Sequence, residues 1–308
     1  PASCSDYGRG GAAMKRNVMV LGTNGMLGSM LVRRWSEGST FVLFGGVRRA
    51  VAPELAGKLK GVLNDLDATS FCKGERSRLA DFIRQNNIAV LANCVGVIKQ
   101  RAGGQDPVET TTVNALFPHQ LAQVCSATAA RLIHVSTDCV FSGDKGLYSE
   151  TDTPDAQDFY GRSKALGEVG APHLTLRTSI IGPELSSGEG LGLLAWLLHQ
   201  KGPIVPGYSR AVFSGVTTLT LADLIANIVV GQPEMAGLFH VASEPIDKFS
   251  LLSKINRIFG LGLEVVADSA LRIDRSLDAS KIKAFMGYTP PSWDDQLTAL
   301  ARLRDDQA

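Results

Sequence analysis

Tyr160 and Lys164 are the two side chains of this 308-residue sequence whose types and spacing best suit proton transfer. They lie four residues apart in a segment, 159–169 (FYGRSKALGEV), that predicts a helix, so both face one side, about 5–6 Å apart at Cβ. An ammonium placed there favours the phenolate and lowers a tyrosine pKa that is ordinarily about 10. Such a tyrosine can protonate a carbonyl oxygen as hydride reaches the carbon. The same spacing occurs on solvated helix surfaces, so its context must decide.

A second group of polar residues ends the strand predicted within 131–141 (RLIHVSTDCVF). Open α/β sheets bind ligands at the carboxyl ends of their strands. A hydroxyl at Thr137 could bind the substrate oxygen there and orient it towards Tyr160. We take Thr137, Tyr160 and Lys164 as the catalytic candidates, and Ser136, Asp138 and Cys139 as substrate contacts, although Ser136 by itself is more typical of a structural residue.

The elements that must position these residues follow a regular order. Short apolar runs alternate with amphipathic stretches from Asn17 onwards, which predicts a Rossmann-type α/β fold, a doubly wound parallel sheet. The rhythm changes after Pro183. We therefore predict an NAD(P)-binding domain over 14–182 and a smaller mixed α/β substrate region over 183–308, of which parts of 211–244 could rejoin the main sheet. Residues 1–13 are interpreted as a remnant ahead of a natural start at Met14.

A glycine-rich turn, G-x-x-G-x-x-G, joins the first predicted strand to the first helix. Backbone N–H groups and the helix N-terminus can approach a pyrophosphate at such a turn, where the helix dipole favours negative charge. The spacing alone is weak, because a purely structural turn could share it, but its place at the first strand–helix junction favours dinucleotide binding. The candidate contacts are Gly22, Asn24, Gly25, Met26, Leu27 and Gly28.

The end of the second predicted strand indicates which dinucleotide would bind. No acidic residue stands where an NAD site would hold the ribose 2′-hydroxyl, and Arg48 and Arg49 follow instead. A guanidinium suits a 2′-phosphate, so we predict NADPH (NADP+) as the cofactor, although either arginine could be an ordinary surface charge. Further cofactor contacts are expected from Asp65 and Leu66 at the adenine, from Cys94, Val95 and Gly96 at the nicotinamide ribose, and from Asn114 as a brace for Lys164.

Composition excludes several other classes of function. The net charge of +1 gives no reason to expect nucleic acid or a membrane surface as a partner. The five cysteines form no C-x-x-C and no zinc spacing, so no metal site is predicted and the thiols are expected to be free. No apolar run approaches the roughly 18 residues of a membrane span, and residues 1–16 lack the apolar core of a signal peptide. We expect a cytoplasmic protein.

Several motifs in order resemble the extended short-chain dehydrogenase/reductase superfamily, and within it the dTDP-4-dehydrorhamnose reductase-like branch. They span about 14–300 and include LGTNGMLG, NCVGVIKQ, HVSTDCVFSG, YGRSKALGE, LRTSIIGPE, GLFHVAS and GYTPPSW. The resemblance implies a Thr-Tyr-Lys site at Thr137, Tyr160 and Lys164 that reduces the 4-keto group of a nucleotide-linked deoxysugar in polysaccharide biosynthesis. The resemblance also implies that a diphosphate-binding arginine falls on Arg275, with Arg210 as second candidate.

Two further substrate contacts are less specific. Lys99 belongs to a basic, glycine-rich loop, 97–104, that could close over an anionic substrate or be an ordinary surface loop. Trp196 has a helical spacing with leucines that is typical of a core residue, although its ring could stack on a sugar or base. A homodimer is one possible oligomeric state.

Three activities remain open within this resemblance. Cys139 stands where nucleotide-sugar dehydratases carry a glutamate, and a thiol cannot replace that carboxylate in elimination, so dehydratase activity is disfavoured. An epimerase that retains NAD is an alternative, against which Arg48 and Arg49 argue. A non-catalytic regulatory subunit shares the same fold, and the complete Thr137, Tyr160 and Lys164 set argues against it.

Overall fold

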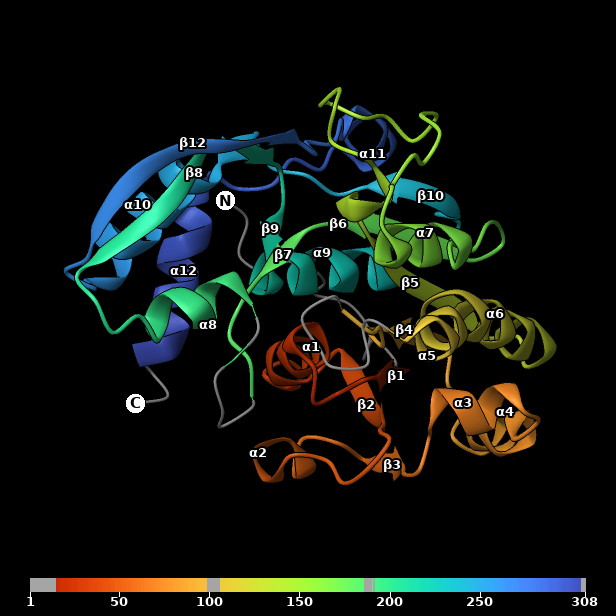
Figure 1. The fold of residues 1–308 in the computed structure, drawn as a ribbon. Coiled ribbons are helices and arrows are strands. Elements are labelled where there is room, and N and C mark those ends of the chain that lie inside the picture. Colours follow the sequence, from red (N-terminus) through yellow and green to blue (C-terminus); the bar gives the residue numbers. More distant parts are fainter. Residues whose placement is uncertain (1–14, 99–105, 186–189, 191, 306–308) are drawn as a thin grey trace.

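The computed structural model describes residues 15–98, 106–185, 190 and 192–305. Its centre is a seven-stranded sheet in the order β10-β6-β5-β4-β1-β2-β3, in which all paired strands run parallel (Figure 1). The predicted fold class is therefore confirmed. The strands are β1 (Arg16–Leu21), β2 (Phe41–Gly46), β3 (Gly61–Leu63), β4 (Val90–Asn93), β5 (Arg131–Thr137), β6 (Leu174–Thr178) and β10 (Gly237–His240).

Helices cover both faces of this sheet because its strands are apolar on both sides. Along β1, Val18 and Val20 join one buried cluster while Met19 and Leu21 join the other, as the two-residue period of a strand requires. The first cluster lies against α1 (Met26–Ser36) and α9 (Thr218–Gly231). The second lies against α3 (Ala68–Cys72), α4 (Arg76–Gln85) and α6 (Phe117–Ala127), which stack along one side of the sheet (Figure 1).

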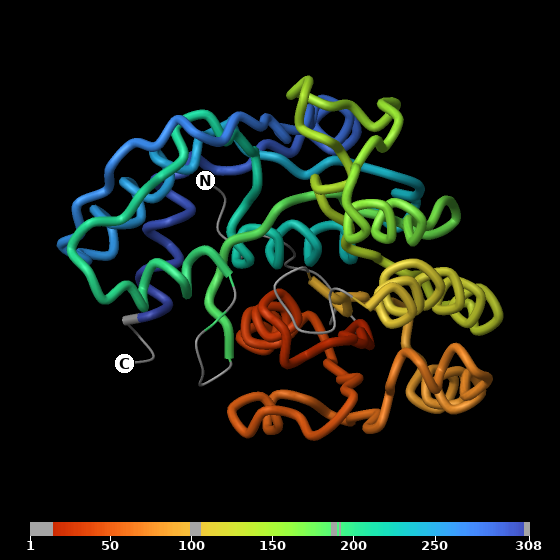
Figure 2. Tube along the Cα trace, in the orientation of Figure 1, coloured from red at the N-terminus to blue at the C-terminus, as the bar shows by residue number. Residues whose placement is uncertain are grey.

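The second half of the chain adds a smaller, mixed layer. Its three-stranded sheet has β8 (Ile204–Phe213) between β11 (Ile246–Asp247), which is antiparallel to it, and β12 (Glu264–Asp274), which is parallel. On this sheet pack α10 (Lys248–Phe259) and, behind it, α12 (Trp293–Asp305). Figure 2 follows the chain as α9 and β10 return to the main sheet before α10, β12 and α12 complete the smaller layer. Residues 237–240 thus form an edge strand of the main sheet.

The remaining elements are short connections. They are α2 (Pro53–Ala56), α5 (Pro107–Thr111), the π-helix η2 (Thr112–Leu116), the 3-10 helix η3 (Asp138–Val140), α7 (Phe159–Leu166), β7 (Ile180–Ile181), α8 (Leu193–Leu198), β9 (Val216–Thr217) and α11 (Ser280–Met286). Within the described ranges, none of the helices combines the length and apolar character needed to cross a bilayer.

Candidate active site

The three catalytic candidates meet at the carboxyl end of β5. Thr137 is the last residue of that strand, and its side chain hydrogen-bonds to the Tyr160 side chain. Lys164, one turn further along α7, is buried and donates from Nζ to the carbonyl oxygen of Val135 at 2.9 Å. Strand β5 therefore holds both ends of the Tyr160–Lys164 pair, Tyr160 through Thr137 and Lys164 through Val135.

A glycine allows helix α7 to approach η3 closely. Gly161 follows Tyr160 in α7, and a Cβ built on it would lie 2.1 Å from the carbonyl oxygen of Cys139 and 2.5 Å from the Ala156 Cβ. Any side chain there would push the first turn of α7 away from η3. The Asp158 side chain begins the helix by accepting a hydrogen bond from the Gly161 N–H at 2.9 Å. The position of Tyr160 is thus fixed by a cap and by direct backbone packing.

Burial controls the acidity of Tyr160. Desolvation raises its pKa well above the ordinary value of 10, the charges of Cys139 and Asp138 raise it further, and the hydrogen bond with Thr137 opposes the rise. The sequence predicted that Lys164 would lower this pKa, and for the protein without cofactor that prediction is wrong. Its physical reason is that the Lys164 ammonium is directed to the Val135 carbonyl. The phenol is accordingly held as a protonated acid.

A buried network surrounds Lys164. Desolvation lowers the pKa of Lys164 to about 8, and the negative charge of Glu168 works against that effect. Glu168 is itself paired with Arg177, with Nη2 to Oε2 at 2.6 Å and Nε to Oε1 at 2.7 Å. The Ser136 hydroxyl donates to the same carboxylate at 2.7 Å. Ser136, predicted as a substrate contact, therefore has a structural partner in this network.

Asn114 lies in the π-helix η2, a type of distortion that is frequent at functional sites. Its Oδ1 accepts from the Val97 N–H at 2.9 Å, and its Nδ2 donates to the Val97 carbonyl at 3.0 Å and to the Ser163 hydroxyl at 3.2 Å. Asn114 thus joins the loop after β4 to the helix that carries Lys164. The side-chain hydrogen bonds of Asn114 reach Val97 and Ser163, the residue before Lys164, and the brace for Lys164 stays a prediction.

The glycine turn is built to leave the start of α1 open. Gly22 has φ of +77°, and a Cβ on Gly28 would lie 2.1 Å from the Gly22 carbonyl oxygen, so both positions need glycine. Gly25 is the N-cap of α1 and makes no side-chain cap, and the first turn carries no acidic residue. The helix N–H groups are therefore available to an anion. Leu27 is buried in the core, whereas Met26 lies near Gly192.

Asn24 connects the glycine turn to the loop that follows β2. Its Nδ2 donates to the Ala50 carbonyl at 2.9 Å, and its Oδ1 accepts from the Ala52 N–H at 3.0 Å. Arg48 and Arg49 immediately precede this clamp and are exposed. The clamp therefore holds the backbone just after both arginines beside the glycine turn, at the carboxyl edge of the sheet.

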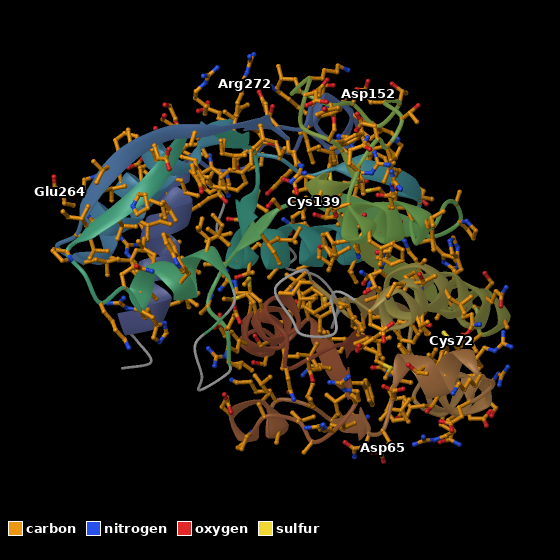
Figure 3. The ribbon with its side chains drawn as sticks, viewed as in Figure 1. Asp65, Cys72, Cys139, Asp152, Glu264 and Arg272 are labelled. Carbon is orange, nitrogen blue, oxygen red and sulfur yellow. The ribbon has the colours of Figure 1, made fainter. Side chains whose placement is uncertain are left out.

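The remaining predicted cofactor contacts lie along the same edge. The Cys94 N–H donates to the Leu21 carbonyl at 3.1 Å, and the Val95 N–H donates to Asn93 Oδ1 at 3.1 Å, so the loop after β4 packs against Gly22. Gly96 is exposed. At the far end, Leu66 is half-buried and its N–H donates to the Val47 carbonyl at 2.9 Å. Asp65 is exposed beyond β3 (Figure 3).

On the substrate side, η3 meets residues from the second half of the chain. Asp138 is buried, accepts a hydrogen bond from the Thr137 hydroxyl at 3.1 Å, and has its pKa raised by desolvation against the opposing charges of Lys248 and Arg275. Arg275 donates from Nε to the Phe141 carbonyl at 2.9 Å and from Nη1 to the Cys139 Sγ at 3.8 Å. The structure thus brings Arg275 to the site.

Other predicted substrate contacts are not brought to it. Arg210 is exposed on β8, in register with Arg272, whose side chain projects from the outer side of β12, away from Cys139 (Figure 3). Trp196 is 40% exposed on α8, because Leu194 and Leu197 occupy the buried side of that short helix. Lys99 lies outside the described residues.

Two charged residues of this region were missed by sequence reasoning. Glu168 could have been found, because it continues the four-residue spacing of Tyr160 and Lys164 by one more step. Lys248 had no local signal, because only the pairing of β11 with β8 brings it near η3.

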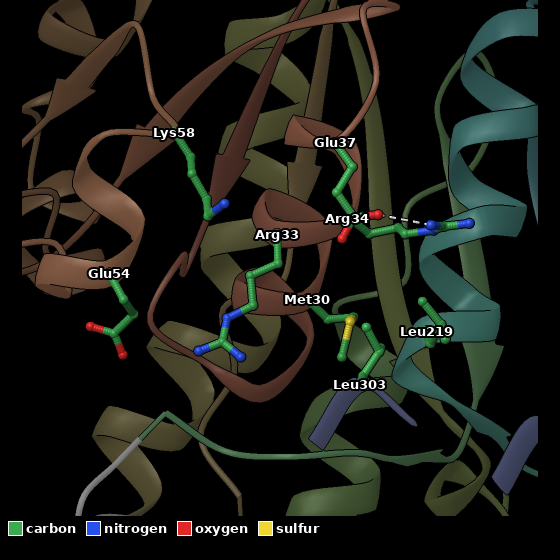
Figure 4. A pocket seen from close by; sticks show the side chains of 8 residues that line it. All are labelled: Met30, Arg33, Arg34, Glu37, Glu54, Lys58, Leu219 and Leu303. Carbon is green, nitrogen blue, oxygen red and sulfur yellow. Dashed lines mark hydrogen bonds and ion pairs between the residues drawn. The ribbon is translucent and has the colours of Figure 1, made fainter. Parts of the chain in front are cut away.

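A cavity of about 430 Å³ lies elsewhere, beside the second half of α1 (Figure 4). Of the described residues predicted for catalysis or cofactor binding, none lines it. Its arginine Arg34 is already paired with Asp223 at 2.7 Å and with Glu37 at 2.8 Å. We therefore do not place the active site there. The lining residues are Met30, Arg33, Arg34, Glu37, Glu54, Lys58, Leu219 and Leu303.

Comparison with known proteins identifies the family. The family model described as the RmlD substrate binding domain matches residues 15–304. The chain belongs to this family. The probable low-salt glycan biosynthesis reductase Agl14 of Haloferax volcanii is 30% identical over 313 residues, covering 93% of this chain and 98% of the relative. The dTDP-4-dehydrorhamnose reductase of Salmonella typhimurium is 25% identical over 209 residues, covering 64% and 68%.

The fold has a solved counterpart in the same group of proteins. A crystal structure of the dTDP-4-dehydrorhamnose reductase from Bacillus anthracis, solved in complex with NADP, superposes with a TM-score of 0.73 at 19% identity, covering 93% of this chain and 99% of that one. The family predicted from the motifs is confirmed, and the predicted enzyme class, an oxidoreductase, agrees with the reductase names of these relatives.

Proposed function

We propose that this protein is an NADPH-dependent reductase that converts the 4-keto group of a nucleotide-linked deoxysugar to a hydroxyl, in the synthesis of a polysaccharide or glycan. The observation that carries the proposal is the Thr137–Tyr160 hydrogen bond beside the buried Lys164, at the sheet edge that also holds the glycine turn. The reductase names of the relatives support the reaction class.

The residues at this edge fit a dinucleotide phosphate. The uncapped start of α1 and the cradle between Gly22 and Gly28, which a Cβ would fill, suit the pyrophosphate. Arg48 and Arg49 suit a 2′-phosphate. Lys164 would hold the nicotinamide ribose. When bound, the cofactor supplies the hydride, and the protein supplies position and a proton.

The chemistry assigned to the chain is general acid catalysis. When hydride reaches the carbonyl carbon, the O–H bond of Tyr160 breaks and its proton passes to the carbonyl oxygen. The keto group becomes an alcohol, and Tyr160 is left as a tyrosinate. Thr137 orients that oxygen. Arg275, beside Cys139, would bind the diphosphate.

Replacement of Tyr160 by Phe tests the proposal. We expect NADPH affinity within about threefold of the wild type and kcat lower by roughly 10²–10⁴-fold, because only the proton donor is lost. NADPH consumption is followed with dTDP-, UDP- and GDP-linked 4-keto-6-deoxysugars. The control is Tyr208→Phe, at a tyrosine 41% exposed on β8, which should leave kcat unchanged. Undiminished turnover by the Tyr160 variant would refute the assignment.

The NAD-dependent epimerase is the second candidate, and the nucleotide that binds separates the two. A reductase with a 2′-phosphate site should bind NADPH in preference to NADH and release it after each turnover. Tightly retained NAD in the purified protein, together with interconversion of sugar epimers without added cofactor, would replace the reductase by the epimerase.

A further inference from the structure

Lys248 occupies an unusual position at the start of α10. Its neighbour Asp247 is the helix N-cap, and both oxygens of that carboxylate are used by Ser250, from the N–H at 2.9 Å and from the hydroxyl at 2.7 Å. The Lys248 ammonium instead lies over the ring of Phe213, 3.4 Å from its centroid. The pairing of β11 with β8 fixes this contact, because Ile246 pairs with Phe213.

Three physical effects disfavour a lysine there. A cation at a helix N-terminus faces the positive end of the helix dipole. Desolvation lowers the pKa of Lys248 to about 8 although Asp138 favours the charged form. The ammonium also has no hydrogen-bond acceptor anywhere in the part of the chain that the structure describes. A half-buried ammonium without an acceptor needs an explanation other than stability.

The charged and polar groups near this ammonium supply that explanation. The charge of Lys248 acts on the Asp138 carboxylate and on the Cys139 thiol, the two residues that follow Thr137. Arg275 acts on the same carboxylate. The Asp138 carboxylate thus faces two cations, while its Oδ1 already accepts from Thr137. One positive charge beside Thr137 is left without an opposing negative group among these residues.

We propose that Lys248 is a substrate-binding residue whose ammonium binds an anionic oxygen of the nucleotide sugar held at Thr137. The shared chemistry is an oxyanion, which either the diphosphate or a carboxylate on the sugar could supply. The inference rests on the proposed function for the identity of the ligand, but it concerns binding and so can fail or hold independently of turnover.

The test is a binding titration of the full chain with NADP+ present. Wild type and Lys248→Met are titrated with dTDP, UDP, UDP-glucose and UDP-glucuronic acid by calorimetry. Loss of a charge-assisted hydrogen bond should weaken binding about 10- to 100-fold. If Lys248→Met binds every probe more weakly, the ammonium binds the phosphates. If it binds only UDP-glucuronic acid more weakly, the ammonium binds the sugar carboxylate. The matched control is Lys254→Met on the same helix, whose ammonium pairs with Asp294 instead.

Stability separates this role from a structural one. If Lys248 serves the ligand, Lys248→Met should raise Tm while it lowers affinity, because it removes a desolvated cation that has no hydrogen-bond acceptor. A structural lysine would give a lower Tm and unchanged affinity. If the Met variant does not fold, Lys248→Gln is measured in the same way.

The pH dependence of affinity gives an independent readout. The groups facing Lys248 are Asp138 and Cys139, with Arg275 on the other side of Asp138. The wild-type affinity for the anion should fall as pH rises through about 8, because the ammonium loses its proton. Lys248→Arg, which stays charged, should lose this dependence, whereas effects of Lys164 are common to both proteins.

Either of two results would overturn the proposal. One is binding of every probe by Lys248→Met within twofold of the wild type. The other is failure of the wild type to bind any anionic probe. If Lys248→Met weakens binding but no keto-sugar nucleotide is reduced, the binding site stands and the proposed reductase function fails.

Discussion

The packing of Gly161 against η3 makes a sharp prediction about catalysis. In Gly161→Ala the new Cβ would lie 2.1 Å from the Cys139 carbonyl oxygen, whereas ordinary contact begins at 3.4 Å. Relief of the overlap requires a displacement of about 1.3 Å between α7 and η3. Because Tyr160 precedes this residue and hydrogen-bonds to Thr137, the displacement separates the proton donor from the group that orients the substrate.

A misplacement of about 1 Å costs roughly 100-fold in rate, so we expect at least that loss in kcat. Overpacking should also lower the free energy of unfolding by about 1–3 kcal/mol. The assay is steady-state NADPH oxidation, with unfolding by urea measured in parallel, and KM for NADPH should change little. Gly170→Ala is the control, because a Cβ there meets nothing within 4 Å. A kcat within threefold of wild type in Gly161→Ala would show that this packing does not position Tyr160.

Two further predictions concern the cofactor and the buried lysine. Replacing both Arg48 and Arg49 by Ala should raise KM for NADPH at least tenfold and leave KM for NADH within twofold, measured as initial rates; equal effects on both would contradict a 2′-phosphate site. Because the pKa of Lys164 is lowered to about 8, the unfolded chain binds more protons between pH 8 and 10.5. The stability advantage of Lys164→Met over wild type in urea unfolding should therefore shrink by roughly 3 kcal/mol across that window, and a constant difference would contradict the burial of this charge.

The sheet was predictable because strands that are buried on both faces appear in the sequence as continuous apolar runs. The run that forms β1 is apolar at successive positions, and glycines follow it where the chain must turn, so strand and junction could be read together. The edge at which ligands meet then followed from the parallel order alone. Thr137, Tyr160 and the glycine turn could be placed on one edge without any knowledge of distances.

The pKa of Tyr160 could not be predicted in the same way. The i, i+4 spacing fixes that Tyr160 and Lys164 share a helix face, but it does not say which acceptor the ammonium finds. In the structure the Val135 carbonyl accepts a hydrogen bond from the Lys164 ammonium, and desolvation is the largest effect on the pKa of the Tyr160 phenol. The spacing in the sequence determines which side chains share a helix face. Tertiary packing determines how far those side chains are desolvated and which groups they hydrogen-bond to.

The substrate side was predicted least well, and strand geometry explains one error. In β8 the alternation of exposed and buried residues places Arg210 on the outer face, and the sequence IVPGYSRAVF carries that alternation only weakly because glycine, proline and serine interrupt it. Trp196 was predicted as a substrate contact, with a core position as the alternative, and the structure places its side chain 40% exposed. Its helix is six residues long, too short for all of its apolar side chains to share one buried face.

The two halves of the site therefore differ in how they are built. The glycine turn follows β1, Thr137 ends β5 and Tyr160 begins α7, so the catalytic and cofactor candidates all depend on the one parallel sheet and its connections. On the proposed substrate side, the charges come from α10 and from the segment after β12, and the smaller sheet brings them near Asp138 and Cys139. Because Cys139 brings no carboxylate, the two cations Lys248 and Arg275 act on the single carboxylate of Asp138. On the proposed function, substrate choice depends on residues more than 100 positions away from Thr137 in the chain, and it can change without any change in Thr137, Tyr160 or Lys164.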